Sequence, residues 1–415
     1  MDSSRQKSQS IETTLEEVGR NNRDTDHLQR REEEQLQVPN VGMYYPTAGS
    51  FHASGIAMYI QQLIKFHNGN YSPFLYTETG DIADKLQQID ADIIQSNSGR
   101  YKKIGGLVKR YLDITDSIPP SILDEKLPLL LKAFQDGILR DADDDLDVLL
   151  THHYFDNIVL SNLLEIPVVH VFHGVQSVGI GMKAWKKLSK SKYIIANSRH
   201  TKDIVENELE REVTGIVHPG VDIDQFNPNI ASFNDALFDR DEFVILFAGR
   251  FVESKGIYDL LEAMDKLPPK FHLYMIGRGD RRKIDEHIQA FDLEDSVTIE
   301  DSVAHNTLPQ YYTAADVVCS PTHYDSFCMV NVEAMACGTP VVTTDIAGVS
   351  EYAIDRETAL LAPPNDPNEL AGALLELAES PKLWKNLREN GRSMVERYSW
   401  GNSSQELHHV CQKIL

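Results

Sequence analysis

The chain is poor in cysteine, in positive charge and in long apolar runs, and each shortage excludes a class of protein. Four cysteines in 415 residues have neither metal-ligand spacing nor the density of a disulfide scaffold. No run of about 18 apolar residues is present, so no segment is predicted to span a membrane. Lysine and arginine number 40 against 63 acidic residues, and a net charge of -23 argues against nucleic acid as a partner. These features favour a protein of the reducing cytoplasm.

Strand-like apolar runs alternate with helix-like segments along both halves of the chain. This alternation predicts an α/β protein with parallel sheets, whose ligands bind at the carboxyl ends of the strands. We expect a first domain over residues 41–218 and a second over residues 219–394, since 415 residues fill two or three domains. Residues 1–40 are polar and charged, so we expect a disordered tail without the apolar core of a signal peptide.

The most informative segment lies between residues 316 and 340. Residues 316–320 are an apolar run that predicts a buried strand, and residues 327–337 have a helical pattern. Asp325 then lies at the entrance of the helix, where free backbone N–H groups favour anions and polar hydroxyls. Glu333 lies about two turns deeper on nearly the same face, so both carboxylates can face one ligand. Taken singly, Asp325 could be a helix cap and Glu333 a solvated residue.

The whole segment resembles the C-terminal signature of retaining glycosyltransferase family 4, enzymes of the GT-B fold. That signature is an acid, seven residues, and then Glu-Ala-Met-Ala-x-Gly-x-Pro-Val-Val, which the chain matches from Glu333 through Val342. The resemblance implies that Asp325 contacts hydroxyls of the donor sugar and that Glu333 contacts the nucleotide ribose. The residues expected to line the same donor site are Ser326, Phe327, Cys328, Met329 and Val330.

The segment also departs from the family pattern at the sugar end. Asp325 stands where glutamate is usual, and Ser326 and Cys328 stand where glycine commonly lets backbone amides approach the sugar. The identity of the donor sugar therefore stays open.

A second cluster follows the apolar run 243–248, at Arg250 and Lys255. A diphosphate leaving group needs compact positive charge at a strand end, which arginine supplies as a fork and lysine as a point charge. The resemblance assigns both residues to the donor diphosphate. In isolation, each could be solvated surface.

Two glycines are further candidates for contacts with the donor. Gly277 ends the apolar run 273–276, and in the family such a turn lies beside the nucleotide, although an ordinary tight turn is the alternative. The third glycine of a dinucleotide fingerprint is absent, so the signal for NAD is weak. Gly55 precedes a predicted amphipathic helix and resembles the family's first loop, whose N–H groups face donor phosphates or the acceptor. A plain loop and cap is the alternative.

Histidines follow two predicted strands of the first half. The run 167–172 ends at His173, and it resembles the family's strand whose terminal histidine meets the donor sugar across the cleft. His170, inside the strand, is predicted to be a satisfied core histidine. His152 and His153 end another strand and are interpreted as loop histidines, with an approach to the acceptor as the alternative.

Residues 218–222 carry a Pro-Gly-Val-Asp linker like that of the family, which we interpret as structural, with Asp222 at the cleft as the alternative. The resemblance further implies that the helix at residues 395–415 packs back on the first domain.

Three segments bear on metals, membranes and the acceptor. The acidic run 141–145 suggests an Asp-x-Asp metal site, but it lies far from the donor motifs, so we predict a hydrated loop and no metal site. The basic run 182–192 around Trp185 could contact anionic lipid at the inner membrane face, or be a solvated helix face. Residues 100–140 are predicted to be an acceptor-specific insertion.

The sequence thus predicts a GT-B enzyme with two Rossmann-like domains facing a cleft. By resemblance, it moves a hexose from a nucleoside diphosphate sugar to an unidentified glycan, lipid-linked or small-molecule acceptor, with retention and without cofactor or metal. In the mechanism usually proposed for the family, the leaving phosphate takes the acceptor proton, and no protein nucleophile is evident. A sugar nucleotide epimerase of the same fold and a non-catalytic sugar-nucleotide-binding subunit are the alternatives.

Overall fold

The computed structural model describes residues 38–45, 48, 55–78, 86, 88, 90–96, 138–175, 180–230 and 242–415. The predicted tail at 1–40 and the predicted insertion at 100–140 lie outside the described residues, except for residues 38–40 and 138–140. The loop that precedes Gly55 also lies outside them. Asn40–Leu415 form one compact unit.

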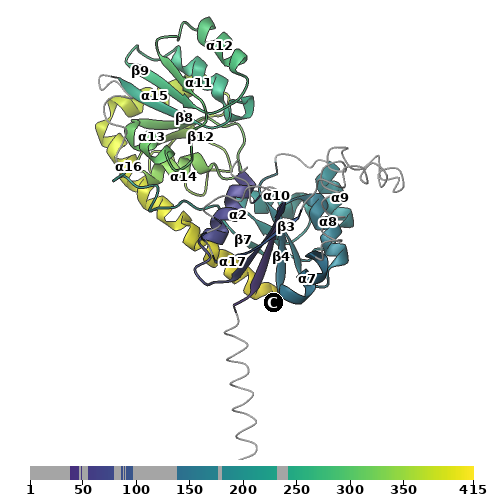
Figure 1. The fold of residues 1–415 in the computed structure, drawn as a ribbon. Helices are drawn as coiled ribbons and strands as arrows, with labels where there is room; N and C mark the ends of the chain where they lie inside the picture. Colours follow the sequence, from purple (N-terminus) through teal and green to yellow (C-terminus); the bar gives the residue numbers. More distant parts are fainter. Residues whose placement is uncertain are drawn as a thin grey trace, which may run out of the picture. The chain divides into compact units, whose positions relative to one another are not determined.

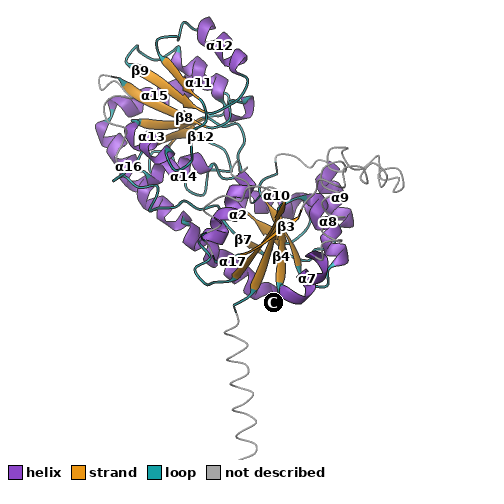
Figure 2. Ribbon diagram, viewed as in Figure 1, coloured by secondary structure: helices purple, strands orange, loops and turns teal. Residues whose placement is uncertain are grey.

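The first half of the chain builds a parallel sheet with the strand order β3-β2-β1-β4-β5-β6-β7 (Figures 1 and 2). Its strands are β1 (Asn40–Tyr44), β2 (Ser72–Glu78), β3 (Asp92–Ser96), β4 (Val148–Thr151), β5 (Val168–Phe172), β6 (Ile194–Ala196) and β7 (Gly215–Ile216). Every residue of β4 and β5 is buried. Such continuous burial is typical of parallel strands that helices cover on both faces.

The helices of this first domain pack their apolar residues against the sheet. Those within the described residues are α2 (Gly55–Lys65), α7 (Ile138–Asp145), α8 (Tyr154–Leu163), α9 (Ile180–Leu188) and α10 (Arg199–Leu209). Helix α2 buries Ile60, Leu63 and Ile64 in the cluster that contains Val41 of β1. Helix α9 buries Trp185 in a separate cluster on Phe172 of β5.

The second half builds another parallel sheet, in the order β10-β9-β8-β11-β12-β13. Its strands are β8 (Phe243–Ala248), β9 (Phe271–Ile276), β10 (Val297–Glu300), β11 (Val317–Ser320), β12 (Val341–Thr344) and β13 (Leu360–Ala362). Its helices are η2 (Glu253–Lys255), α11 (Ile257–Met264), α12 (Arg281–Ala290), α13 (Leu308–Ala314), α14 (Met329–Ala336), α15 (Pro367–Glu379) and α16 (Pro381–Val395). Leu246 of β8 packs on the side of α14, and Ile245 packs on the side of α11.

Both sheets confirm the predicted doubly wound architecture. The strand order reverses between β1 and β4 in the first sheet and between β8 and β11 in the second. At such switch points the loops after the strands diverge, and a crevice for ligands opens at the carboxyl ends. Arg250 follows β8, and Asp325 follows β11, so the two lie at this end of the second sheet.

Two sequence-based predictions of local structure were wrong. The predicted helix at residues 327–337 begins later, because Cys328 has a left-handed backbone (φ 53°) and α14 starts at Met329. The acidic run 141–145 is the end of α7 rather than a hydrated loop. Ala142 and Leu146 are buried in a cluster with Tyr44, and this apolar anchor holds the segment in a helix.

The chain crosses between the two domains twice, and the crossings lie side by side. Val221 of the linker donates its N–H to the carbonyl of Tyr398, at 2.7 Å. A Cβ atom at Gly220 would lie 2.5 Å from the backbone nitrogen of Trp400, so the close approach requires glycine. After η3 (Glu396–Tyr398), helix α17 (Trp400–Ile414) packs Leu407 on the first domain's core (Figure 1). The predicted return of the C-terminal helix is confirmed.

His218 is the centre of an ionic cluster at this junction. Its Nδ1 lies 2.8 Å from Glu406 Oε1 on α17, and its Nε2 lies 3.0 Å from Glu351 Oε2 of the second domain. The backbone N–H of Arg199 on α10 also donates to Glu351, at 2.7 Å. Burial alone would lower the pKa of His218, but its hydrogen bonds to the two glutamates and their charges raise the pKa to about 9. The protonated ring therefore links three parts of the chain.

This cluster makes stability depend on pH. A raised folded-state pKa stabilises the fold fully below the ordinary histidine pKa of about 6.5, and the contribution is lost as pH rises through about 9. We expect the free energy of unfolding of the native chain to fall by up to about 3 kcal/mol over that interval, and His218→Gln to lack this fall. Urea denaturation at several pH values measures it.

The matched control is His409→Gln. His409 is an exposed histidine on α17, the helix that also carries Glu406. The control should keep the pH dependence of the native chain. Equal pH slopes for the native chain and His218→Gln would contradict the proposed role of the cluster.

Candidate active site

A cavity of about 580 Å³ is lined by residues of both domains. The first domain contributes Tyr45 after β1, Tyr59 of α2 and Asn197 after β6, and the predicted site residues that line the cavity are Gly55, His173, Arg250, Asp325, Ser326, Phe327, Cys328, Met329 and Glu333. Lys255, Gly277 and Val330 lie outside its lining. Most of the residues that the sequence singled out, from segments far apart in the chain, therefore meet around one space.

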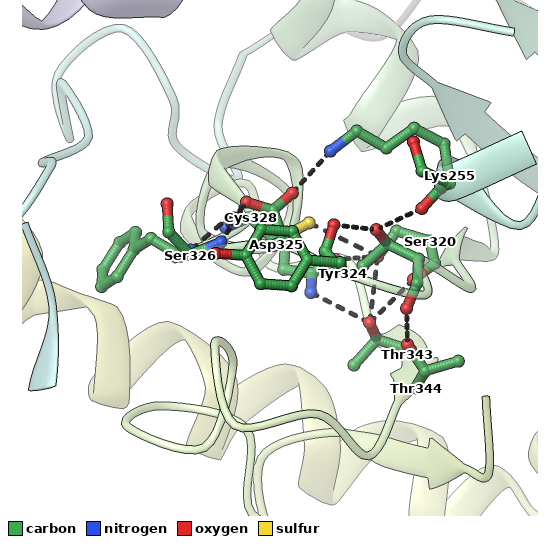
Figure 3. Close-up of polar contacts among 12 residues, drawn as sticks. Lys255, Ser320, Tyr324, Asp325, Ser326, Cys328, Thr343 and Thr344 are labelled. Carbon is green, nitrogen blue, oxygen red and sulfur yellow. Dashed lines mark hydrogen bonds and ion pairs between the residues drawn. The ribbon is translucent and has the colours of Figure 1, made fainter. Parts of the chain in front are cut away.

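The carboxylate of Asp325 organises the turn between β11 and α14. Its Oδ1 accepts the backbone N–H groups of Ser326 at 2.8 Å, Phe327 at 3.3 Å and Cys328 at 3.1 Å. Its Oδ2 lies 2.5 Å from Nζ of Lys255, which reaches it from η2 of the neighbouring strand connection (Figure 3). Both oxygens are thus engaged before any ligand binds.

The charges of this pair are mutually stabilised. Burial alone would raise the pKa of Asp325, but the ammonium of Lys255 and the hydrogen bonds to the carboxylate hold the pKa below its usual value. Burial alone would lower the pKa of Lys255, but Cys328 and Asp325 raise it. Asp325 is therefore ionised near neutral pH and can only accept hydrogen bonds, while Lys255 keeps its positive charge.

A buried polar network supports the turn from behind. The hydroxyl of Tyr352 donates to the carbonyl of Phe327 at 2.7 Å. Asn331 of α14 donates to the same hydroxyl at 3.2 Å and accepts from Ser320 of β11. These side chains are buried, so breaking one contact would leave polar groups unpaired away from water. The network fixes the left-handed backbone at Cys328.

Ser326 joins the turn to the first domain. Its hydroxyl donates to the carbonyl of His173 at 2.8 Å and accepts from Nδ2 of Asn197 at 3.0 Å. A Cβ atom at Gly174 (φ 127°) would lie 2.8 Å from Cβ of Ser326, so the contact also requires glycine at position 174. The serine that replaces the family's usual glycine is thus a bridge between the domains.

Glu333 is buried on α14, and both its oxygens have partners. Nε2 of His305 lies 2.7 Å from Oε1, and the hydroxyl of Tyr312 donates to Oε2 at 3.0 Å. The two donors hold the carboxylate toward the cavity, which His305 also lines. Each oxygen retains a second lone pair for a ligand hydroxyl.

Arg250 is exposed after β8, and its side chain makes no hydrogen bond or ion pair with the residues that the structure describes. The backbone of Gly277 packs closely against the backbone of Gly249, next to Arg250. A Cβ atom there would lie 1.7 Å from the carbonyl oxygen of Gly249, and its φ is 157°. Gly277 thus permits the close approach of the loops after β8 and β9, which places Arg250 at the cavity.

His173 ends β5 and lies against His152, which ends β4. His152 Nδ1 and His173 Nε2 are 2.7 Å apart, and Tyr59 packs its ring edge-on to His173, with centroids 4.9 Å apart. Burial, reinforced by neighbouring histidines, lowers the pKa of His152 well below its usual value and that of His173 to about 3. His170 is buried as predicted, but its Nδ1 has no partner among the described residues, which corrects the expectation of full satisfaction.

Several cavity residues were not found by sequence reasoning. Asn197 stands directly after the apolar strand β6. This position at the carboxyl end of a parallel strand could have marked it as a site residue. Tyr59 and His305 carried no such signal, because a helix tyrosine and a loop histidine are usually structural. Asp222, which the sequence left between linker and cleft, lines the cavity and pairs with Lys65 at 2.7 Å.

The remaining predictions concern membranes, metals and cysteines. Within α9, Trp185 is fully buried and donates to Asn157, so its ring is not available to a lipid surface, whereas Lys183 and Lys187 are exposed. No helix within the described ranges is long and apolar enough to cross a bilayer. Across those same ranges, no group of three or more potential ligands is arranged to hold a metal ion. All four cysteines are buried and free.

Comparison with known proteins agrees with this geometry. The model of Glycosyltransferase Family 4 matches residues 55–225, and that of Glycosyl transferases group 1 matches residues 228–394. A D-inositol 3-phosphate glycosyltransferase of Xylanimonas cellulosilytica is 28% identical over 316 residues, which cover 67% of this chain and 75% of that protein.

Two solved structures share the fold. Sucrose-phosphate synthase from Thermosynechococcus elongatus has a TM-score of 0.75 and 23% identity, over 91% of this chain and 99% of that one. HepE from Anabaena, in complex with UDP and glucose, has a TM-score of 0.71 and 17% identity, over 91% of this chain and 100% of that one.

Two doubly wound domains with a shared cavity after their strands define the GT-B fold. More particularly, the chain belongs to glycosyltransferase family 4, whose two models together match both of its domains.

The loop that carries Lys255 depends on a glycine. Gly256 has φ 65°, and a Cβ atom there would lie 1.8 Å from the carbonyl oxygen of Pro321. Because neither backbone can yield, we expect Gly256→Ala to lower the free energy of unfolding by about 2–4 kcal/mol, as measured by urea denaturation.

Gly372→Ala is the matched control, since Gly372 lies in α15 with no atom within 4 Å of an added Cβ. In this control, the free energy of unfolding should rise by about 0.5–1 kcal/mol, because alanine favours the helix over glycine. A Gly256→Ala protein as stable as the native chain would refute the steric argument.

Proposed function

We propose that this glycosyltransferase uses a nucleoside diphosphate sugar as donor and transfers its hexose with retention of configuration. The observation that carries the proposal is the combination, in one cavity, of a guanidinium without a partner among the described residues, a half-buried carboxylate and a buried carboxylate. Arg250, Asp325 and Glu333 all line it. A positive group for a diphosphate and two acceptors for hydroxyls match the three parts of a sugar nucleotide.

Arg250 and Lys255 would stabilise the leaving diphosphate. The guanidinium of Arg250 is available for two parallel hydrogen bonds to phosphate oxygens. Lys255 is held beside Asp325 and could move its ammonium toward the phosphate as negative charge develops there. Electrostatic stabilisation of this kind is often the largest contribution to catalysis. With two cationic side chains supplying the charge, we propose a reaction that needs no metal ion.

Asp325 and His173 would orient the sugar, and Glu333 would bind the ribose. Asp325 is a poor candidate for a nucleophile, because its Oδ1 accepts three N–H groups and its Oδ2 pairs with Lys255. A double displacement through this carboxylate is therefore disfavoured. We propose instead that the leaving phosphate accepts the proton of the acceptor hydroxyl on the same face of the sugar.

The acceptor would approach from the side of α2. Tyr45 and Asp222 line the cavity there, and their hydroxyl and carboxylate suit an acceptor rich in hydroxyl groups. The relative named for D-inositol 3-phosphate supports such an acceptor. The exposed lysines of α9 are compatible with a lipid-linked acceptor at an anionic membrane surface.

The donor is tested with a panel of UDP, GDP and ADP sugars, by calorimetric binding and by slow hydrolysis. We expect selective binding of one nucleotide class, weakened by about 10- to 100-fold in Arg250→Ala, since a hydrogen bond to a charged group contributes about 1.5–3 kcal/mol. Hydrolysis should be lost in Asp325→Ala.

Arg282→Ala is the control for Arg250→Ala, because Arg282 is an exposed arginine on α12 that pairs with Glu286. It should bind the donor like the native chain. Binding without any turnover, even with acceptors present, would favour a non-catalytic subunit, and conversion of the sugar without an acceptor would favour an epimerase. No binding of any panel member would refute the donor site.

A further inference from the structure

We propose that His152 is a positioning residue that fixes the tautomer of His173, so that His173 presents its Nδ1–H to the donor sugar. The inference rests on the function proposed above and extends it to a residue outside the cavity lining. It is carried by the contact between the two rings and by one unpaired ring nitrogen.

The two histidines are held together by the sheet and by aromatic neighbours. His152 and His173 follow β4 and β5, which are adjacent parallel strands. Their ring centroids are 5.0 Å apart, and the two ring planes are inclined by 29°, so the rings meet edge to edge through the two nitrogens. Tyr59 packs edge-on against both rings, with its centroid 6.3 Å from that of His152 and 4.9 Å from that of His173. This packing opposes rotation of either ring.

A single proton lies between the rings. The distance of 2.7 Å between His152 Nδ1 and His173 Nε2 is that of a hydrogen bond, which needs one donor and one acceptor. Burial lowers the pKa of each histidine, so both rings are neutral near pH 7. A neutral imidazole carries one N–H and one acceptor nitrogen, and the position of one proton therefore decides that of the other.

The unpaired nitrogen indicates which ring donates. Nε2 of His152 is buried and has no partner among the described residues. If His173 donated, His152 would carry its own proton on this nitrogen, as a buried N–H without an acceptor. Orphaned buried N–H groups are rarer than under-satisfied acceptors. We infer that His152 donates from Nδ1 to Nε2 of His173.

His173 then carries its proton on Nδ1, which is the ring nitrogen left for a ligand. Its Nε2 is occupied by His152, and its carbonyl accepts from Ser326. A neutral N–H donor on the first domain faces an ionised acceptor, Asp325, on the second, and both line the cavity. A sugar hydroxyl could accept from one and donate to the other, which a reversed tautomer would prevent.

The test compares His152→Leu, which removes the donor, with His152→Asn, which keeps an amide N–H near the position of Nδ1. In the native chain, ¹⁵N NMR of the ring nitrogens should show the His173 proton on Nδ1. His152→Asn should keep that tautomer, and His152→Leu should lose it. With the donor sugar, kcat/KM should fall by about 10-fold in His152→Leu, the loss of one neutral hydrogen bond, and be restored in His152→Asn.

Two further measurements separate a positioning role from a structural one. The Kd of the nucleoside diphosphate alone should be unchanged in His152→Leu, because the effect is confined to the sugar. His287→Asn, at a histidine of α12 that contacts the carbonyl of Lys283, should resemble the native chain in every assay.

A proton on Nε2 of His173 in the native chain would overturn the inference, and so would a His152→Leu protein with unchanged tautomer and rate. The NMR measurement needs no turnover. A failure of the proposed function, seen as no binding of any donor, is therefore distinguishable from a failure of this inference, seen as the wrong tautomer.

Discussion

The ion pair between Asp325 and Lys255 is the interaction on which the rest of the site depends. One oxygen of Asp325 gathers three backbone N–H groups, and the other holds Lys255 from the neighbouring strand connection. The turn that results places Ser326 against the first domain and starts α14, on which Glu333 stands. A Cβ atom at Gly348 would lie 1.8 Å from the carbonyl of Asp325, so a third loop closes on the same turn.

Much of this order exists before a ligand arrives. Asp325 is already ionised and hydrogen-bonded, and Glu333 is already held by His305 and Tyr312. A ligand would not have to pay for ordering these groups, which is the advantage of a preorganised site. Arg250 is the contrast, since it is exposed and without an ion-pair partner in the described part of the chain. Its order would come from the ligand.

The sequence predicted the features that depend on neighbours along the chain. Strand β8 was predicted from residue 243 as an apolar strand ending in Gly-Arg, because an apolar run and a following glycine are local signals, and the observed strand ends at Ala248. Helical periodicity predicted that Asp325 and Glu333 face one ligand, and both line the cavity, although Asp325 precedes α14. The late start of α14 was missed, since the left-handed backbone of Cys328 depends on Tyr352, which lies far along the chain.

The individual hydrogen bonds between the domains could not be predicted. The bond from Ser326 to His173 joins positions 153 residues apart, and the pairing of His218 with Glu351 spans 133 residues. One sequence gives no signal for such pairs. His152 and His173 meet because they follow neighbouring strands, β4 and β5, and the sequence alone does not show that these two strands are adjacent.

The most direct test of the central role of the ion pair is a double-mutant cycle on donor binding. The Kd of the sugar nucleotide would be measured for the native chain, Lys255→Met, Asp325→Asn and the double variant. We predict a coupling free energy of about 0.5–3 kcal/mol, as for residues in direct contact that act together. Additive effects, within about 0.3 kcal/mol, would contradict the account, because the two side chains would then serve the donor independently.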